Sequence, residues 1–80
     1  MVMQVRIKSV YGEERIRVPK SISAGTLMND HLRRFGIKGQ GPLCAILLDG
    51  VVLFPRATLE ELALPDEVTL TVVLMRATAI

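Results

Sequence analysis

Only one segment of the chain carries apolar residues at helical spacing, and this single helix narrows the possible folds more than any other feature. Within Ser23–Phe35 the apolar residues recur every three or four positions, while most polar residues fall on the opposite side. Ser23 is a favourable N-cap, and Gly36 can adopt the left-handed conformation that ends many helices. Because one helix covers only one face of a sheet, a sheet in this chain must leave its other face to solvent.

The segment before the helix has the pattern of a β-hairpin. Met3–Lys8 alternates apolar and polar residues over six positions, and Arg15–Val18 alternates again. Such period-two patterns are typical of half-buried strands. Gly12 lies in the connection and can adopt turn conformations, whereas Pro19 cannot donate to a ladder and therefore ends the second strand.

The segment after the helix predicts three more strands and a short helical turn. Leu43–Leu48 and Val51–Phe54 flank Asp49-Gly50, and Asp-Gly between apolar runs is a strong hairpin signal. Thr58–Leu62 has the capping-box pattern that begins a helical turn. Val68–Leu74 alternates so that every second residue from Val68 to Leu74 should face the core. The prediction is an α+β domain with a five-strand sheet packed on one face by one helix.

Composition excludes several functional classes. The longest apolar runs fall far short of the roughly 20 residues of a membrane-spanning helix. A lone cysteine, Cys44, permits no internal disulfide, and this indicates a reducing setting, cytoplasmic or nuclear. The net charge of +2 and the lack of aromatic residues among the basic ones argue against nucleic acid. His31 and Cys44 are interpreted as core residues, so we expect no enzyme, metal or cofactor.

The ordered set of elements and residues resembles the ubiquitin-like family. The resemblance extends from Met3 to Arg76, needs small length adjustments only in the first hairpin and in the loop after the helix, and implies the β-grasp fold. No single motif is specific, but their order is. The matching residues are Met3-Gln4-Val5, Gly12 at the hairpin turn, Ser23 at the helix cap, Gly36-Ile37, Leu48-Asp49-Gly50, Thr58-Leu59 and Val68–Leu74.

The resemblance also implies an interaction surface. Members of the family present an apolar patch on the sheet, and its positions correspond here to Val10, Leu47, Thr71 and Val73. Val73 is also the apolar exception on the otherwise polar face of the last strand. The resemblance therefore predicts a domain that binds protein partners, including receptors of the ubiquitin pathway.

The segment after the last strand departs from the family pattern. Conjugated members have a Gly-Gly pair shortly after the position of Arg76, whereas this chain continues Ala77-Thr78-Ala79-Ile80. We therefore expect a non-conjugated ubiquitin-like domain over residues 3–76, with a short tail over residues 77–80.

The sequence allows two other modes of binding. Arg6, Lys8, Arg15 and Arg17 share the outer face of the first hairpin, and a basic edge strand can pair with an acidic partner. The apolar runs around Asp49-Gly50 could instead support self-association, so the chain is expected to be a monomer or a weak dimer.

Overall fold

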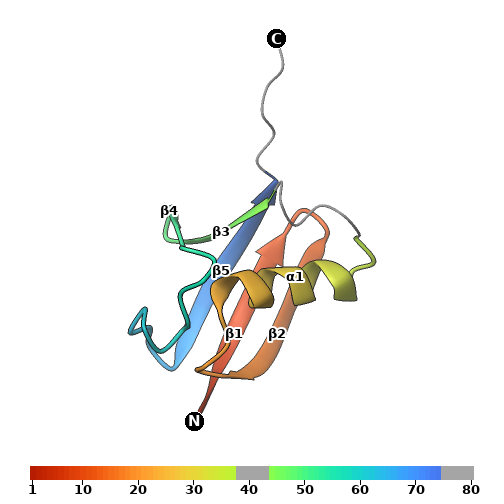
Figure 1. Cartoon of the computed structure of the whole chain (residues 1–80). Helices are drawn as coiled ribbons and strands as arrows, with labels where there is room; N and C mark the ends of the chain where they lie inside the picture. Colours follow the sequence, from red (N-terminus) through yellow and green to blue (C-terminus); the bar gives the residue numbers. More distant parts are fainter. Residues whose placement is uncertain (38–43, 75–80) are drawn as a thin grey trace.

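A computed structural model, which describes residues 1–37 and 44–74, shows a mixed five-stranded sheet with one helix packed on one face (Figure 1). The strand order is β2-β1-β5-β3-β4. β1 and β5 at the centre run parallel, and the other neighbouring strands run antiparallel. The elements are β1 (Val2–Ser9), β2 (Gly12–Pro19), α1 (Ala24–Arg34), β3 (Cys44–Leu48), β4 (Val51–Val52) and β5 (Glu67–Leu74).

Both ends of α1 have the predicted caps. The Ser23 hydroxyl accepts a hydrogen bond from the Thr26 amide at 3.2 Å. At the other end Gly36 has a φ of 75°, and the Ile37 amide donates to the Leu32 carbonyl at 2.8 Å. This pattern is a Schellman motif, which satisfies carbonyls that the last turn would otherwise leave free. The predicted segment Ser23–Phe35 is therefore the helix together with its two capping residues.

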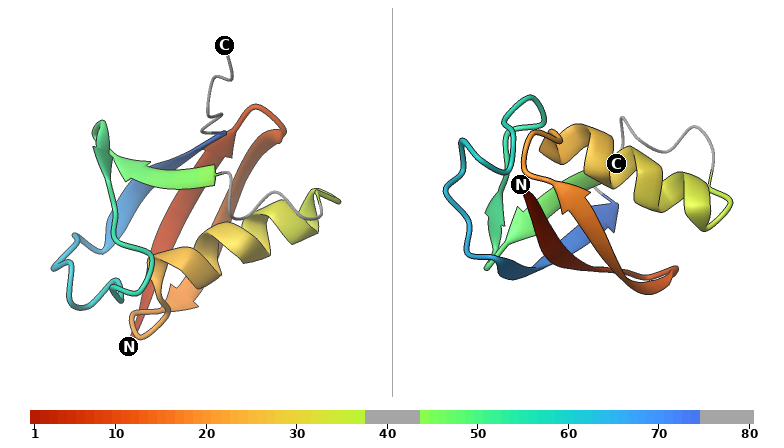
Figure 2. Two further views of the ribbon diagram at one scale, coloured as in Figure 1. Left: turned by 45° about the horizontal axis from the view of Figure 1, so that its top comes forward. Right: turned by 90° about the horizontal axis from the view of Figure 1, so that it is seen from below.

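The core lies between α1 and the inner face of the sheet, which curves around the helix (Figure 2). The alternation predicted for β1 holds, because Met3, Val5 and Ile7 are all buried. The core side chains come from α1, from the strands of the sheet and from the turn that contains Leu59. Its largest fully buried apolar side chains are Val5, Ile7, Leu27, Ile46, Leu59 and Leu70.

The second hairpin has the predicted turn but a shorter strand than expected. Asp49 and Gly50 have φ values of 50° and 80°, as a type I′ turn requires, and Leu48 pairs with Val51. Val51–Phe54 was expected to be a strand, yet β4 ends at Val52. The Leu53 amide still donates to the Ile46 carbonyl of β3 at 2.9 Å, and beyond it the Pro55 carbonyl accepts a hydrogen bond from Gly25 at the start of α1.

The predicted helical turn near Thr58 forms, because the Leu62 amide donates to the Thr58 carbonyl at 3.1 Å. Its capping box also forms, with the Thr58 amide 2.9 Å from the Glu61 carboxylate. One further expectation needs correction. Leu74 was expected in the core but is 36% exposed, because it lies at the end of β5. The proposed domain end at Arg76, the tail 77–80 and the first residue of the Leu43 strand lie outside the described residues.

Candidate functional site

The outer face of the sheet, which points away from α1, has a residue map set by the strand registers. Residues directly opposite each other on neighbouring strands share a face, so each register defines a row of side chains across the sheet. The row nearest the turn of the first hairpin holds Val73 and Ala45. The next row crosses all five strands and holds, in order, Glu13, Lys8, Thr71, Leu47 and Val52. The third row holds Arg15, Arg6 and Thr69, and the fourth holds Arg17, Gln4 and Glu67.

Three of the four residues predicted for the interaction surface lie together on this face. Leu47 is directly opposite Thr71, and Val73 is two positions along β5 on the same side. Leu47 and Val73 are half-buried, and Thr71 is exposed. Val10 is apart from them at the tip of the first hairpin, beyond the last paired position of β1 and β5, and it is 88% exposed.

Two further apolar residues complete this part of the face. Ala45 is opposite Val73, and Val52 is opposite Leu47 and 55% exposed. The two-residue Asp49-Gly50 turn sets the register of β3 against β4, so this turn was the signal in the sequence that could have identified Val52. Here the apolar patch means Ala45, Leu47, Val52, Thr71 and Val73.

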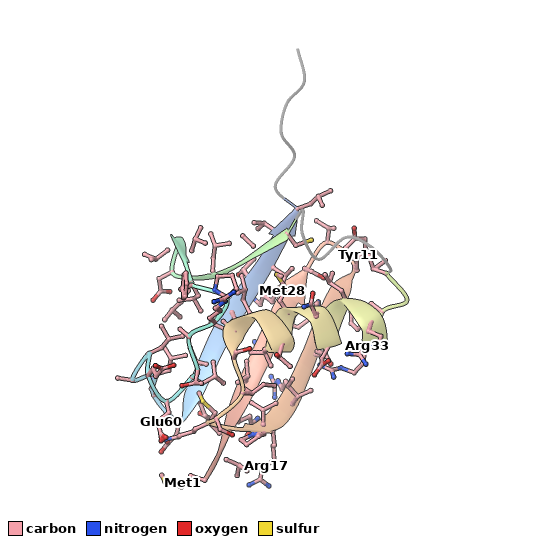
Figure 3. The ribbon with its side chains drawn as sticks, in the orientation of Figure 1. Met1, Tyr11, Arg17, Met28, Arg33 and Glu60 are labelled. Carbon is pink, nitrogen blue, oxygen red and sulfur yellow. The ribbon has the colours of Figure 1, made fainter. Side chains whose placement is uncertain are left out.

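The four basic residues of the first hairpin also lie on the outer face. Arg6 is directly opposite Arg15, and Arg17 is opposite Gln4, with β2 at the edge of the sheet as predicted. Arg17 projects near Met1, at the opposite end of the sheet from Tyr11 (Figure 3). Arg6, Lys8, Arg15 and Arg17 are called the basic half below.

An open hollow of about 340 Å³ lies in the basic half, over the boundary between β1 and β5. Arg6, Arg15, Gln4 and Thr69 contribute to its lining together with Glu67. The Arg6 guanidinium pairs with Glu13 at 3.0 Å, and both side chains of this pair are partly exposed. The hollow is therefore polar, with two guanidinium groups side by side at its rim.

On the inner face the structure brings together a polar cluster that sequence reasoning missed. His31 is fully buried, as predicted for a core residue, but it is not without partners. Its Nδ1 contacts the Glu14 carboxylate, and its Nε2 is 2.9 Å from the Ser9 hydroxyl. The Arg34 guanidinium donates to the same carboxylate at 2.7 Å. The contacts link residues 17 and 22 positions apart, which no local pattern could reveal.

The contacts link the Ser9 hydroxyl to His31 and His31 to Glu14, which is the arrangement of a nucleophile, a base and an orienting acid in a catalytic triad. The surroundings do not suit substrate binding, however. The His31 ring has no exposed surface, and the Phe35 ring covers it at a centroid distance of 4.7 Å. The Ser9 hydroxyl also accepts a hydrogen bond from the Tyr11 amide and contacts the Gly12 carbonyl. The cluster therefore connects the first hairpin to the last turn of α1.

The electrostatics of the cluster follow from its position. Burial acts to raise the pKa of Glu14, but hydrogen bonds and charge from Arg34, and then from His31, outweigh it and hold that pKa below its ordinary value of 4.5.

Elsewhere, burial raises the pKa of the Cys44 thiol, which packs against the core. An inert, partly buried cysteine matches the interpretation made from the sequence.

Within residues 1–37 and 44–74, no three His, Cys, Asp or Glu side chains are grouped so that they could hold a metal ion. The helix in the described part of the chain is not long and apolar enough to cross a membrane.

Comparison with known proteins supports the fold independently of the residue matches. No protein-family model matches the sequence, and no curated protein matches it. A ubiquitin from Caldiarchaeum subterraneum superposes with a TM-score of 0.81 at 15% identity, over 99% of this chain and 100% of that one. A structure described as "Molecular Mimicry of SUMO promotes DNA repair" also gives 0.81, at 19% identity over 91% of each chain. The chain is therefore a ubiquitin-like domain in its fold, with the mixed sheet and single helix of the β-grasp.

Proposed function

We propose that this chain is a ubiquitin-like protein-interaction module that acts by binding and not by catalysis. The observation that carries the proposal is the apolar patch on the solvent-facing side of the sheet. Single exposed apolar residues are ordinary on protein surfaces. Here Leu47 on β3 lies directly opposite Val52 on β4 and diagonally from Val73 on β5, while the core is on the other side of the sheet. A contiguous apolar area on a solvated face is typical of a docking site.

The test is an amide NMR titration of the labelled chain with a ubiquitin-binding helical peptide. We expect chemical-shift changes to concentrate on β3 and β5 around Leu47 and Val73. Val73→Asp should weaken the interaction roughly 5- to 150-fold, since placing a charge in a desolvated contact costs about 1–3 kcal/mol. Asn29→Asp, on the exposed side of α1, is the matched control and should have no effect. Equal binding by both variants would remove the patch from the proposal.

We also propose that the module is not conjugated to other proteins. Its support is the sequence after β5, where Met75-Arg76 is followed by Ala77-Thr78 instead of a Gly-Gly pair. The side chains of Ala77 and Thr78, where the conjugated proteins have none, obstruct the narrow approach that a conjugating enzyme needs. Incubation with a ubiquitin-activating enzyme and ATP, with ubiquitin as positive control, should yield no thioester. A thioester-linked product would refute this part of the proposal.

Self-association is the second candidate, favoured by the exposure of the β4 edge. Val51 begins β4, which has a free edge in the described sheet, and Phe54 comes shortly after this strand. Their side chains are 64% and 66% exposed. Sedimentation over a hundredfold range of concentration tests this. A mass that rises with concentration, and that Phe54→Ser returns to the monomer value, would support a dimer; a constant monomer mass would exclude it.

A further inference from the structure

We propose that the apolar patch and the basic half form one docking surface for a single protein segment, with apolar side chains at one end and carboxylates at the other. This inference rests on the proposed function, because it takes the apolar patch as one end of the site. It adds the chemistry of the partner and combines two binding modes that the sequence presents as alternatives.

The registers make the two areas continuous. Lys8 is directly opposite Thr71, which is itself opposite Leu47, so one row runs from the basic half into the apolar patch. Arg6 is in the next row, opposite Thr69. Both areas therefore belong to one face of one sheet, and no strand separates them.

The same map gives the spacing that a partner must match. Neighbouring strands lie about 4.8 Å apart, and successive residues on one face of a strand lie about 6.7 Å apart. Leu47 is two strands and one row from Arg6, which corresponds to about 12 Å between backbone positions. A helix rises 1.5 Å per residue, so acidic residues about eight positions from the apolar ones would reach Arg6.

The charges on the face call for carboxylates. Arg6 and Arg15 are directly opposite each other, and like charges in this arrangement are unfavourable. Glu13 pairs with Arg6 at 3.0 Å, so an added carboxylate would have Arg15 as its first partner. Over the described parts of the chain, no carboxylate forms an ion pair with Lys8, Arg15 or Arg17. The 340 Å³ hollow beside Arg6 and Arg15 is open and far larger than the roughly 30 Å³ of one water molecule, so a side chain can enter it.

The features of the face favour a protein segment over a nucleic acid. Glu13 and Glu67 also lie on this face and would repel a continuous phosphate backbone. None of the paired positions of the outer face holds an aromatic side chain on which a base could stack. A protein segment with a few carboxylates at one end has no continuous row of negative charges for Glu13 and Glu67 to repel. Its apolar end can contact Leu47 and Val73.

The experiment uses three helical peptides with the same apolar residues and, eight positions along, a pair of Glu, Gln or Lys residues. Binding to the labelled chain is followed by amide NMR. For the wild type we expect the Glu peptide to bind roughly three- to tenfold more tightly than the Gln peptide, from two exposed charge contacts. The Lys peptide should bind most weakly, and 1 M salt should remove the differences because it shortens the screening length to about 3 Å.

Variants distinguish this inference from the proposed function. The double variant Arg6→Gln/Arg15→Gln should bind the Glu and Gln peptides equally well, whereas Arg33→Gln, on the exposed side of α1, should keep the preference. Val73→Asp should weaken all three peptides. If the peptides bind at Leu47 and Val73 with no preference for Glu, the inference is overturned and the proposed function stands. If the Glu peptide binds the basic half and Val73→Asp has no effect, or if no peptide binds, both are overturned.

Discussion

Replacing Glu14 by Gln would test the role of the buried polar cluster directly. The Glu14 side chain is 14% exposed and accepts hydrogen bonds from His31 and Arg34. Glutamine keeps the shape of the side chain, but it removes the negative charge and turns one acceptor into a donor. That donor would face either the Arg34 guanidinium, which cannot accept, or His31 Nδ1, which accepts only in one tautomer. In either case both contacts lose their charge-assisted character.

The magnitude follows from how much of each contact is shielded from water. A hydrogen bond to a charged group contributes about 1.5–3 kcal/mol, and the buried His31 contact should approach that range. The Arg34 side chain is 43% exposed, so its pair with Glu14 should contribute less than about 1 kcal/mol. We expect the free energy of unfolding to fall by about 2–3 kcal/mol, which lowers Tm by roughly 8–20 °C in a domain of this size.

The effect should depend on pH in a defined direction. The folded-state pKa of Glu14 is held below its ordinary value of 4.5, so the stability it contributes is fully present above that value. It is lost as the pH falls through the folded-state pKa, where the wild type is also neutral at this position. The difference between the wild type and Glu14→Gln should therefore be full at pH 7 and much smaller at pH 3.

Urea unfolding followed by far-UV circular dichroism is the suitable assay, because the chain has one tyrosine and no tryptophan. Glu13→Gln is the matched control: Glu13 is the neighbouring residue on the opposite face, and its 3.0 Å pair with Arg6 is partly exposed. The control should lose less than about 1 kcal/mol. Equal losses for the two variants at pH 7, or a Glu14→Gln loss that persists unchanged at pH 3, would refute the reasoning.

Three stability predictions can be checked by the same unfolding assay. Gly12→Ala should cost about 1–3 kcal/mol, because Gly12 has a φ of 148° and a Cβ there would also lie 2.5 Å from the Phe35 ring. Gly36 has a φ of 75° but open space around it, so Gly36→Ala should incur only a backbone cost. If the two glycine variants are equally destabilised, the Phe35 contact is not the cause. Leu59→Ala should cost about 2–5 kcal/mol, since Leu59 is 1% exposed in the core, and a loss below 1 kcal/mol would contradict that burial. Thr58→Ala should cost about 1 kcal/mol by removing the side-chain half of the capping box, and an unchanged midpoint would mean that the box adds nothing to stability.

Sequence reasoning predicted most of the fold because the elements depend on local chemistry. Alternation identified β1, β2 and β5, and Ser23 and Gly36 marked the limits of the helix. The errors occurred where distant residues decide the outcome. β4 is shorter than its apolar run, and after Leu53 the chain bonds to the start of α1 through the Pro55 carbonyl. Pro55, which follows Phe54 directly, was a local sign that the strand ends, but the contact with α1 has none.

The candidate site could be predicted only in part, for the same reason. Position along β3 and β5 was enough to place Leu47, Thr71 and Val73 on one face. The relation between the apolar patch and the basic half depends on the register of β1 against β5, which are about 60 residues apart in the chain (Gln4 opposite Glu67). Parallel pairing over such a separation leaves no short-range signal, so the two areas appeared as separate alternatives.

The two faces of the sheet should respond differently to substitution, because different contacts hold them. The basic half is held beside the apolar patch by the β1–β5 ladder, whose pairs run from Gln4–Glu67 to Lys8–Thr71. The inner cluster acts on β2 instead, since Glu14 is the residue that connects that edge strand to α1. The β1–β2 ladder, which pairs Arg6 with Arg15 and Gln4 with Arg17, does not depend on the cluster, so both arginines should stay in register when the cluster is weakened. A Glu14→Gln variant that remains folded should therefore lose stability but keep its preference for acidic peptides.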